Sequence, residues 1–220
     1  MSRTAFTAEL DQLRLQVELM AVRVDQNLER MREVLERGDV KVVDVALAAD
    51  DEIDAMNVSL TERCYDLLRR EAPVASDLRF VVSVLRVLSE LERIGDLALR
   101  VIKLAPDFDL LVSNPPTYDI LRAMDDQVIE RYRDALRAWA SMDLQLATEL
   151  ATNSRSMDLF YERLLAELLR LSGDDAARVA IATFATGRSL ERISDHAAII
   201  GARLRYLLTG DPDHLAAEVR

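Results

Sequence analysis

Two segments of the sequence pair acidic side chains at a spacing that suits metal chemistry. One reads Leu-Glu-Arg-Ile-Gly-Asp-Leu-Ala and the other Leu-Glu-Arg-Ile-Ser-Asp-His-Ala, so six of the eight aligned positions are identical. The first carries Glu92 and Asp96, and the second carries Glu191 and Asp195. Residues four positions apart share one face of a helix, so each pair presents two carboxylates together. Carboxylate oxygens are hard ligands that suit Mg²⁺, Mn²⁺, Ca²⁺ or iron better than Zn²⁺.

A further acidic pair, Asp50 and Asp54, precedes the first segment. A helical wheel places this pair in the middle of an apolar face, with Glu92 inside a second apolar face and Asp96 near its edge. We therefore expect each half of the chain to carry a buried acidic pair, and two helices of the first half to direct four carboxylates toward the interior. Burying unpaired carboxylates costs roughly several kcal/mol each. Arginine pairing, protonation or a bound metal ion must offset that cost.

Two readings of these carboxylates stay open at this point. Ion pairing is one, because arginines stand at helical spacing from three of them: Asp96 and Arg100, Glu191 and Arg188, Asp195 and Arg192. Metal binding is the other, and the recurrence of the motif in both halves favours it. In the second half, Asp158 aligns with Asp54, but Ser154 replaces the carboxylate of Asp50. We therefore expect a weaker second site around Asp158, Glu191 and Asp195.

The segments that position these residues are all predicted to be helices. Only six Gly and five Pro interrupt 220 residues, and half of the residues are hydrophobic. Apolar spacing predicts two tandem three-helix repeats, in residues 1–108 and 115–210, followed by a frayed tail at 211–220. Within the second repeat, the fifth helix is predicted to run unbroken over 143–171. Proline in the segment 105–116 marks it as a linker.

Composition excludes several classes of protein. The net charge of −11 argues against nucleic acid as a partner, because duplex binding depends on clustered Lys and Arg. The single cysteine, Cys64, cannot form an internal disulfide and fits a reducing compartment. The chain has no signal-peptide pattern and no apolar stretch long enough to span a membrane. We therefore expect a cytoplasmic protein that reaches a membrane only through partners.

A ferritin-like di-metal carboxylate enzyme is the leading enzymatic alternative. Such enzymes use Glu-x-x-His pairs on bundle helices, but Gly95 and Ser194 occupy the positions where those histidines would stand. His196 adjoins Asp195 and is predicted to project away from it. A metal-free helical scaffold is the other alternative, with its acidic residues satisfied by arginines.

The chain resembles the PhoU family over nearly its whole length. The resemblance is carried by the two Leu-Glu-Arg-Ile-x-Asp segments, by Asp50 and Asp54, and by Pro-Val-Ala-Ser-Asp-Leu-Arg at residues 73–79. It implies two pseudo-symmetric three-helix bundles, a homodimer, and divalent or iron-type metal (Mg, Mn or Fe) bound on the bundle surface at these motifs. It also implies a non-enzymatic adaptor between the phosphate ABC transporter ATPase and a sensor histidine kinase. Such an adaptor keeps the phosphate-starvation response off when phosphate is plentiful.

Overall fold

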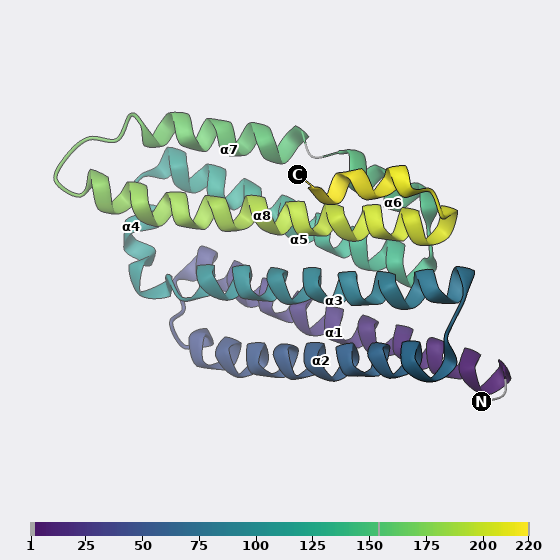
Figure 1. The fold of residues 1–220 in the computed structure, drawn as a ribbon. Coiled ribbons are helices and arrows are strands. Elements are labelled where there is room, and N and C mark those ends of the chain that lie inside the picture. The colour runs from purple at the N-terminus through teal and green to yellow at the C-terminus, as the bar shows by residue number, and fades with distance from the viewer. Residues whose placement is uncertain (1–2, 154, 220) are drawn as a thin grey trace.

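The computed structural model describes residues 3–153 and 155–219, and no strand occurs in that part of the chain (Figure 1). The all-α prediction is confirmed. The elements in chain order are α1 (Arg3–Arg37), α2 (Val42–Glu71), α3 (Ala75–Ile102), η1 (Ala105–Asp107), α4 (Phe108–Val112), α5 (Pro115–Ser141), α6 (Leu144–Thr152), α7 (Arg155–Leu168), α8 (Ala176–Thr209) and η2 (Pro212–Val219).

The first bundle consists of α1, α2 and α3, which pack against one another along their lengths. Its core follows from sequence spacing, because the buried side chains of α1 recur every three or four residues. They include Leu13, Val17, Met20, Val24, Leu28, Met31 and Leu35. Gly38 ends α1 at a positive φ of 63° and donates its backbone N–H to the carbonyl of Val34 at 2.9 Å, as a helix-terminating glycine does.

The second bundle consists of α5, the α6–α7 segment and α8. The two bundles lie side by side, with α8 running along α3 and α5 along α1 (Figure 1). One buried hydrophobic cluster continues through both. The two predicted repeats are therefore joined by a helix–helix seam between α3 and α8, the helices that carry the two Leu-Glu-Arg-Ile-x-Asp segments.

Three segments differ in local structure from what the sequence predicted. The fifth helix is interrupted: α6 ends at Thr152 and α7 begins at Arg155. The segment predicted as a linker folds into η1 and α4, because Leu111 is fully buried and holds it against the bundles. The tail predicted to be frayed forms η2 over Pro212–Val219 and contacts α8.

Within the described residues, no helix is long and apolar enough to cross a membrane.

Candidate functional site

The first carboxylate group consists of Asp50 and Asp54 of α2 and Glu92 and Asp96 of α3. These side chains lie close enough to repel one another: Asp96 acts on each of the other three, and Glu92 also interacts with Asp54. At this point α3 presents Gly95 to α2. A Cβ at that position would lie 3.5 Å from Oδ1 of Asp50. The structure thus brings together the four residues that the sequence singled out.

The expected burial of this group is only partly correct. Asp50, Glu92 and Asp96 are half-buried, and Asp54 is exposed. The wheel overestimated burial because α2 packs on two neighbours only, so part of its apolar face meets solvent. Leu47 and other apolar residues of α2 are exposed as well. The group therefore lines the bundle surface, where a solvent ion has access.

The repulsion within the first carboxylate group changes its protonation. Burial, then Asp96 and Asp54, raise the pKa of Asp50 from 3.8 to about 6. Partial loss of contact with water, followed by repulsion from Asp96, also raises the pKa of Asp54 and of Glu92. Each unit of such a shift corresponds to about 1.4 kcal/mol against the charged form. The ionised group therefore favours a proton or a metal cation.

Arginine pairing does not supply that cation in the first group. Across residues 3–153 and 155–219, none of the four carboxylates forms an ion pair within 4.0 Å, and the anticipated pairing of Asp96 with Arg100 is not formed. The donor set of hard oxygens suits Mg²⁺, Mn²⁺ or iron. In the same described ranges, however, no three His, Cys, Asp or Glu side chains converge as metal ligands. Metal binding here requires the carboxylates to change rotamer, which their partial exposure allows.

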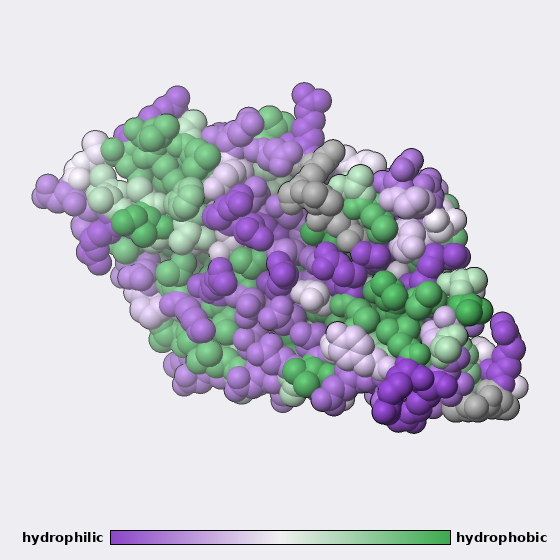
Figure 2. All heavy atoms as spheres, viewed as in Figure 1, coloured by the Kyte–Doolittle hydropathy of each residue, from purple (hydrophilic) through white to green (hydrophobic). Residues whose placement is uncertain are grey.

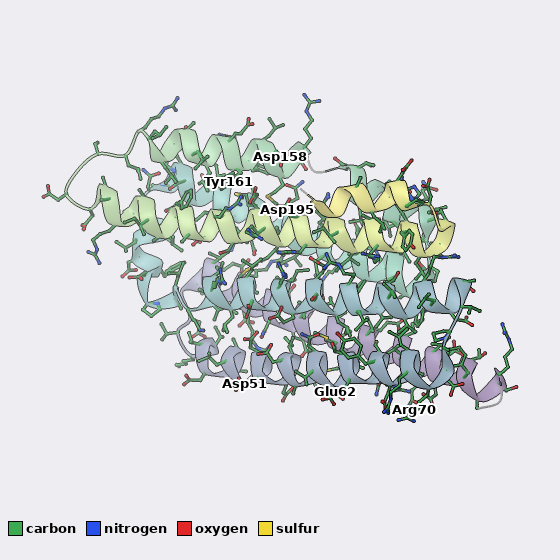
Figure 3. All side chains as sticks on the ribbon, in the orientation of Figure 1. Asp51, Glu62, Arg70, Asp158, Tyr161 and Asp195 are labelled. Atoms are coloured by element: carbon green, nitrogen blue, oxygen red, sulfur yellow. The ribbon has the colours of Figure 1, made fainter. Side chains whose placement is uncertain are left out.

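The second carboxylate group consists of Asp158 of α7 and Glu191 and Asp195 of α8. Figure 3 shows Asp158 and Asp195 on these neighbouring helices, and the two repel each other. Burial is the main cause that raises the pKa of Glu191 and of Asp195. The structure brings together these three predicted residues as well, whereas Ser154 lies outside the described residues.

The second carboxylate group differs from the first because arginine side chains of the protein itself lie close to it. Arg188 forms an ion pair with Glu191, as the spacing predicted. Arg131 of α5, which the sequence analysis did not single out, is attracted by both Asp158 and Asp195. When Asp54 and Asp158 are aligned, Arg131 corresponds to Asn27 in the first half, which carries no charge.

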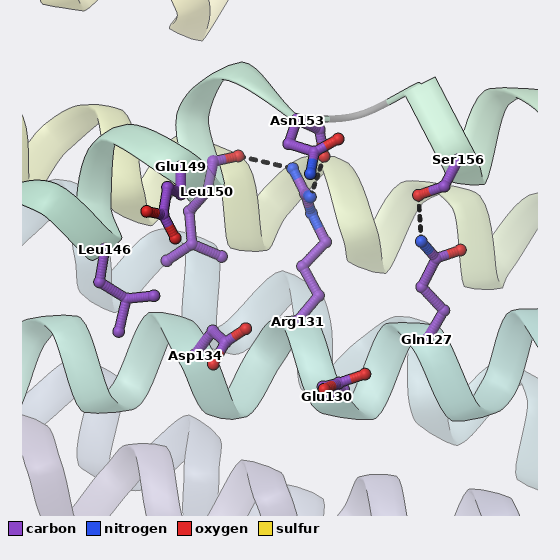
Figure 4. A pocket seen from close by; sticks show the side chains of 9 residues that line it. All are labelled: Gln127, Glu130, Arg131, Asp134, Leu146, Glu149, Leu150, Asn153 and Ser156. Carbon is purple, nitrogen blue, oxygen red and sulfur yellow. Dashed lines mark hydrogen bonds between the residues drawn. The ribbon is translucent and has the colours of Figure 1, made fainter.

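Arg131 also holds the end of α6 in place. Its guanidinium donates to the carbonyl oxygens of Leu150, at 2.6 Å, and of Asn153 (Figure 4). It also donates to the carbonyl oxygen of Ser194 at 3.4 Å. The last carbonyls of a helix lack partners within the helix, so a basic side chain there satisfies them. Arg131 lines a cavity of about 210 Å³ between α5 and the α6–α7 break. The side chain of Arg131 thus stabilises the end of α6, where the predicted fifth helix is interrupted.

A buried hydrogen bond links the two bundles across the seam. Glu90 of α3 is 3 % exposed and His196 of α8 is 5 % exposed, and Oε2 of Glu90 lies 2.6 Å from Nδ1 of His196. Arg86 supports Glu90 at 3.5 Å. Glu90 lies outside the apolar face of α3, and a helical wheel cannot show that a second bundle covers that side of the helix. The seam is therefore partly polar and fixes how α3 and α8 lie against each other.

The comparisons with known proteins agree with this architecture. The PhoU domain model matches residues 17–105 and 121–204. The chain is 32 % identical to the phosphate-specific transport system accessory protein PhoU homolog of Pseudomonas putida, over 93 % of this chain and 81 % of that protein. The crystal structure of PhoU from Pseudomonas aeruginosa superposes with a TM-score of 0.87 at 31 % identity, covering 94 % of this chain and all of that one. The phosphate transport system regulatory protein PhoU from Streptococcus pneumoniae gives 0.84 at 26 % identity, covering 94 % and 98 %.

Proposed function

This chain belongs to the PhoU family, and on that premise we propose that it is an accessory regulator of phosphate transport. It acts as an adaptor between the phosphate ABC transporter ATPase and a sensor histidine kinase and represses the phosphate-starvation response. The names of its relatives support the link to phosphate transport. The adaptor role is non-enzymatic, and the protein reaches the membrane through the transporter.

The state of the adaptor depends on a divalent or iron-type cation bound by the first carboxylate group. The observation that carries this proposal is that four mutually repelling carboxylates gather on one surface without an ion-pair partner in the described ranges. Asp50, Asp54, Glu92 and Asp96 would supply hard oxygen ligands, and water would complete the coordination, as is usual for Mg²⁺ and Mn²⁺. The bound ion would draw α2 and α3 together at the Gly95 crossing.

The second carboxylate group would bind metal less tightly. Arg131 and Arg188 already offset part of the charge of Asp158, Glu191 and Asp195. A metal ion is therefore attracted less strongly to the second group, and both guanidinium groups repel it. We therefore assign metal sensing mainly to the first bundle.

Metal analysis of purified protein tests the cation. Wild type is compared with Glu92→Gln/Asp96→Asn, after incubation with Mn²⁺ or Fe²⁺ and gel filtration. The control is Asp44→Asn/Glu62→Gln, which removes two exposed carboxylates of α2 outside the group. We expect wild type and control to retain metal and the test variant to lose most of it. Equal metal content in all three proteins would refute the metal site.

A capture experiment tests the adaptor role separately. The tagged chain is used to capture the transporter ATPase and the sensor kinase from membranes, with and without a chelator. We expect both partners to be retained and the chelator to reduce their yield. Capture of neither partner would contradict the adaptor role whatever the metal content.

The predicted homodimer has a candidate surface at the end of the second bundle. Figure 2 shows hydrophobic side chains gathered where α7 ends and α8 begins. Leu169 and Ile181 are 88 % and 71 % exposed there. Covering such a patch is favourable by about 25 cal/mol per Å² of apolar surface. Light scattering of the wild type and of Ile181→Glu tests this: we expect a dimer that the substitution dissociates, and a monomeric wild type would overturn it.

A further inference from the structure

A basic hollow opens along the seam between the two bundles. It has a volume of about 300 Å³ and is lined by Arg93, Asp96, Leu97 and Arg100 of α3 and by Arg192 and His196 of α8. In a chain of net charge −11, three arginines converge here with one carboxylate. We call these six residues the seam hollow.

The repeat itself creates this convergence. Arg93 and Arg192 occupy the same position of the two Leu-Glu-Arg-Ile-x-Asp segments, and the side-by-side packing of α3 and α8 brings them to one hollow. Arg100 stands two helical turns after Arg93 and therefore lies on the same side of α3. Nδ1 of His196 is already taken up by Glu90. The three guanidinium groups are thus the donors that the hollow offers to a ligand.

Within the described residues these three arginines have no partner, whereas several other arginines of the molecule are paired. Arg133 pairs with Asp25 and Glu29, and Arg122 pairs with Glu36. By contrast, Arg93, Arg100 and Arg192 form no hydrogen bond or ion pair with any other described residue. Long-range attraction remains, between Arg93 and Glu92 and between Arg192 and the carboxylates that flank it. An excess of carboxylates surrounds these three donors, yet none of them is paired.

We propose that the seam hollow binds free inorganic phosphate. Guanidinium groups present planar, paired N–H donors that match phosphate oxygens, and several of them together hold a doubly charged anion. The volume lies at the small end of the range for small-molecule sites, which suits a small ion with a few water molecules. The proposal rests on the proposed function in phosphate transport and gives that adaptor a ligand of its own.

Asp96 supplies the selectivity. A carboxylate accepts hydrogen bonds but donates none. Near neutral pH inorganic phosphate keeps at least one proton, because its last proton is lost only in strongly alkaline solution, and this proton can be donated to Asp96. Sulfate carries no proton at this pH and would only be repelled. The hollow therefore prefers phosphate to sulfate through the same residue that contributes to the first carboxylate group.

Calorimetric titration of the metal-free protein with inorganic phosphate and with sulfate tests this assignment. Arg93→Gln/Arg192→Gln is compared with Arg163→Gln/Arg178→Gln, a pair at exposed positions on α7 and α8 outside the hollow. We expect the hollow variant to bind phosphate roughly a hundredfold more weakly, since each charged hydrogen-bond donor contributes roughly tenfold. The control pair should bind as wild type does, and circular dichroism checks that every variant is folded.

The variant Asp96→Asn tests the selectivity for phosphate over sulfate. We expect it to bind phosphate and sulfate about equally, whereas wild type prefers phosphate. Absence of phosphate binding to wild type, an equal loss in the control pair, or an unchanged affinity in the hollow variant would overturn the site. Tighter binding of phosphoserine than of inorganic phosphate would overturn the assignment to the free ion. Metal content and partner capture are measured independently, so this proposal and the proposed function fail separately.

Discussion

Replacing Arg131 with methionine tests whether the second bundle depends on its internal cation. Methionine keeps most of the apolar stem of the side chain and removes every N–H donor. The carbonyl oxygens of Leu150 and Asn153 then lose their donor at the end of α6, and the weaker bond to Ser194 is lost with them. Asp158 and Asp195 also lose the charge that attracts them.

The magnitude follows from those contacts. A hydrogen bond from a charged donor contributes about 1.5–3 kcal/mol. The two closer bonds would together contribute about 3–6 kcal/mol, but Arg131 is half-buried and water replaces part of them. We therefore expect Arg131→Met to lower the free energy of unfolding by about 2–4 kcal/mol. For a chain of this length that corresponds to a fall in Tm of about 5–15 °C.

Urea unfolding followed by circular dichroism measures this effect, with Arg163→Met of α7 as the control for loss of an exposed arginine. Titration with Mn²⁺ adds a readout that a purely structural role would not move. The freed carboxylates should make the variant gain more stability from Mn²⁺ than wild type does. A loss no larger than that of the control, about 0.5 kcal/mol for a surface substitution, would refute the reasoning.

Three further outcomes are expected. Burial raises the pKa of Asp125 from 3.8 to about 7 despite its pairing with Arg32 at 3.3 Å. The folded state then binds more protons than the unfolded state, so stability falls by at most about 4 kcal/mol as pH rises from about 4 to about 7. Urea titrations of Asp125→Asn at several pH values should show a smaller fall. Tyr132→Phe removes a buried hydrogen bond of 2.7 Å to the carbonyl of Ala21, so thermal unfolding should show a loss of about 1–2 kcal/mol. Burial raises the pKa of the Cys64 thiol to about 12, so a disulfide-exchange reagent at pH 8 should label it only after unfolding.

The features that sequence reasoning predicted correctly depend on local periodicity. Helical spacing alone located the helices, and the repeated segment revealed the duplication. It also placed Asp50 and Asp54 opposite Glu92 and Asp96, because two helices that pack along their apolar faces bring residues at the centre of those faces together. The helical structure of each segment and the direction of its apolar face therefore follow from the sequence of that segment alone.

The features that sequence reasoning missed depend on contacts between elements. The burial of Glu90 could not be predicted, because the face of α3 that it occupies becomes buried only when α8 covers it. Arg131 was overlooked because its partners are backbone carbonyls of α6 and α8, which no residue type reveals. The break before α7 was missed for the same reason, since an arginine from α5 stabilises the exposed end of α6. These features arise from tertiary structure, which one-dimensional patterns do not describe.

The two copies of the duplicated motif differ in the charges that surround them. Where the first bundle has Asn27, the second has Arg131, and the carboxylates around it follow that difference. In the second group, Arg131 and Arg188 offset part of the negative charge, and Arg131 also holds α6 and α8 against α5. The first group has no ion-pair partner within the described residues. Asp96 belongs both to that group and to the seam hollow, so a metal bound by the first group would alter the charge that a phosphate ion meets at the seam. Because coupling between two binding sites is reciprocal, phosphate would in turn alter the affinity for metal. A metal titration of wild type with and without phosphate should therefore give two different affinities. The same pair of titrations of Asp96→Asn should give closely similar affinities.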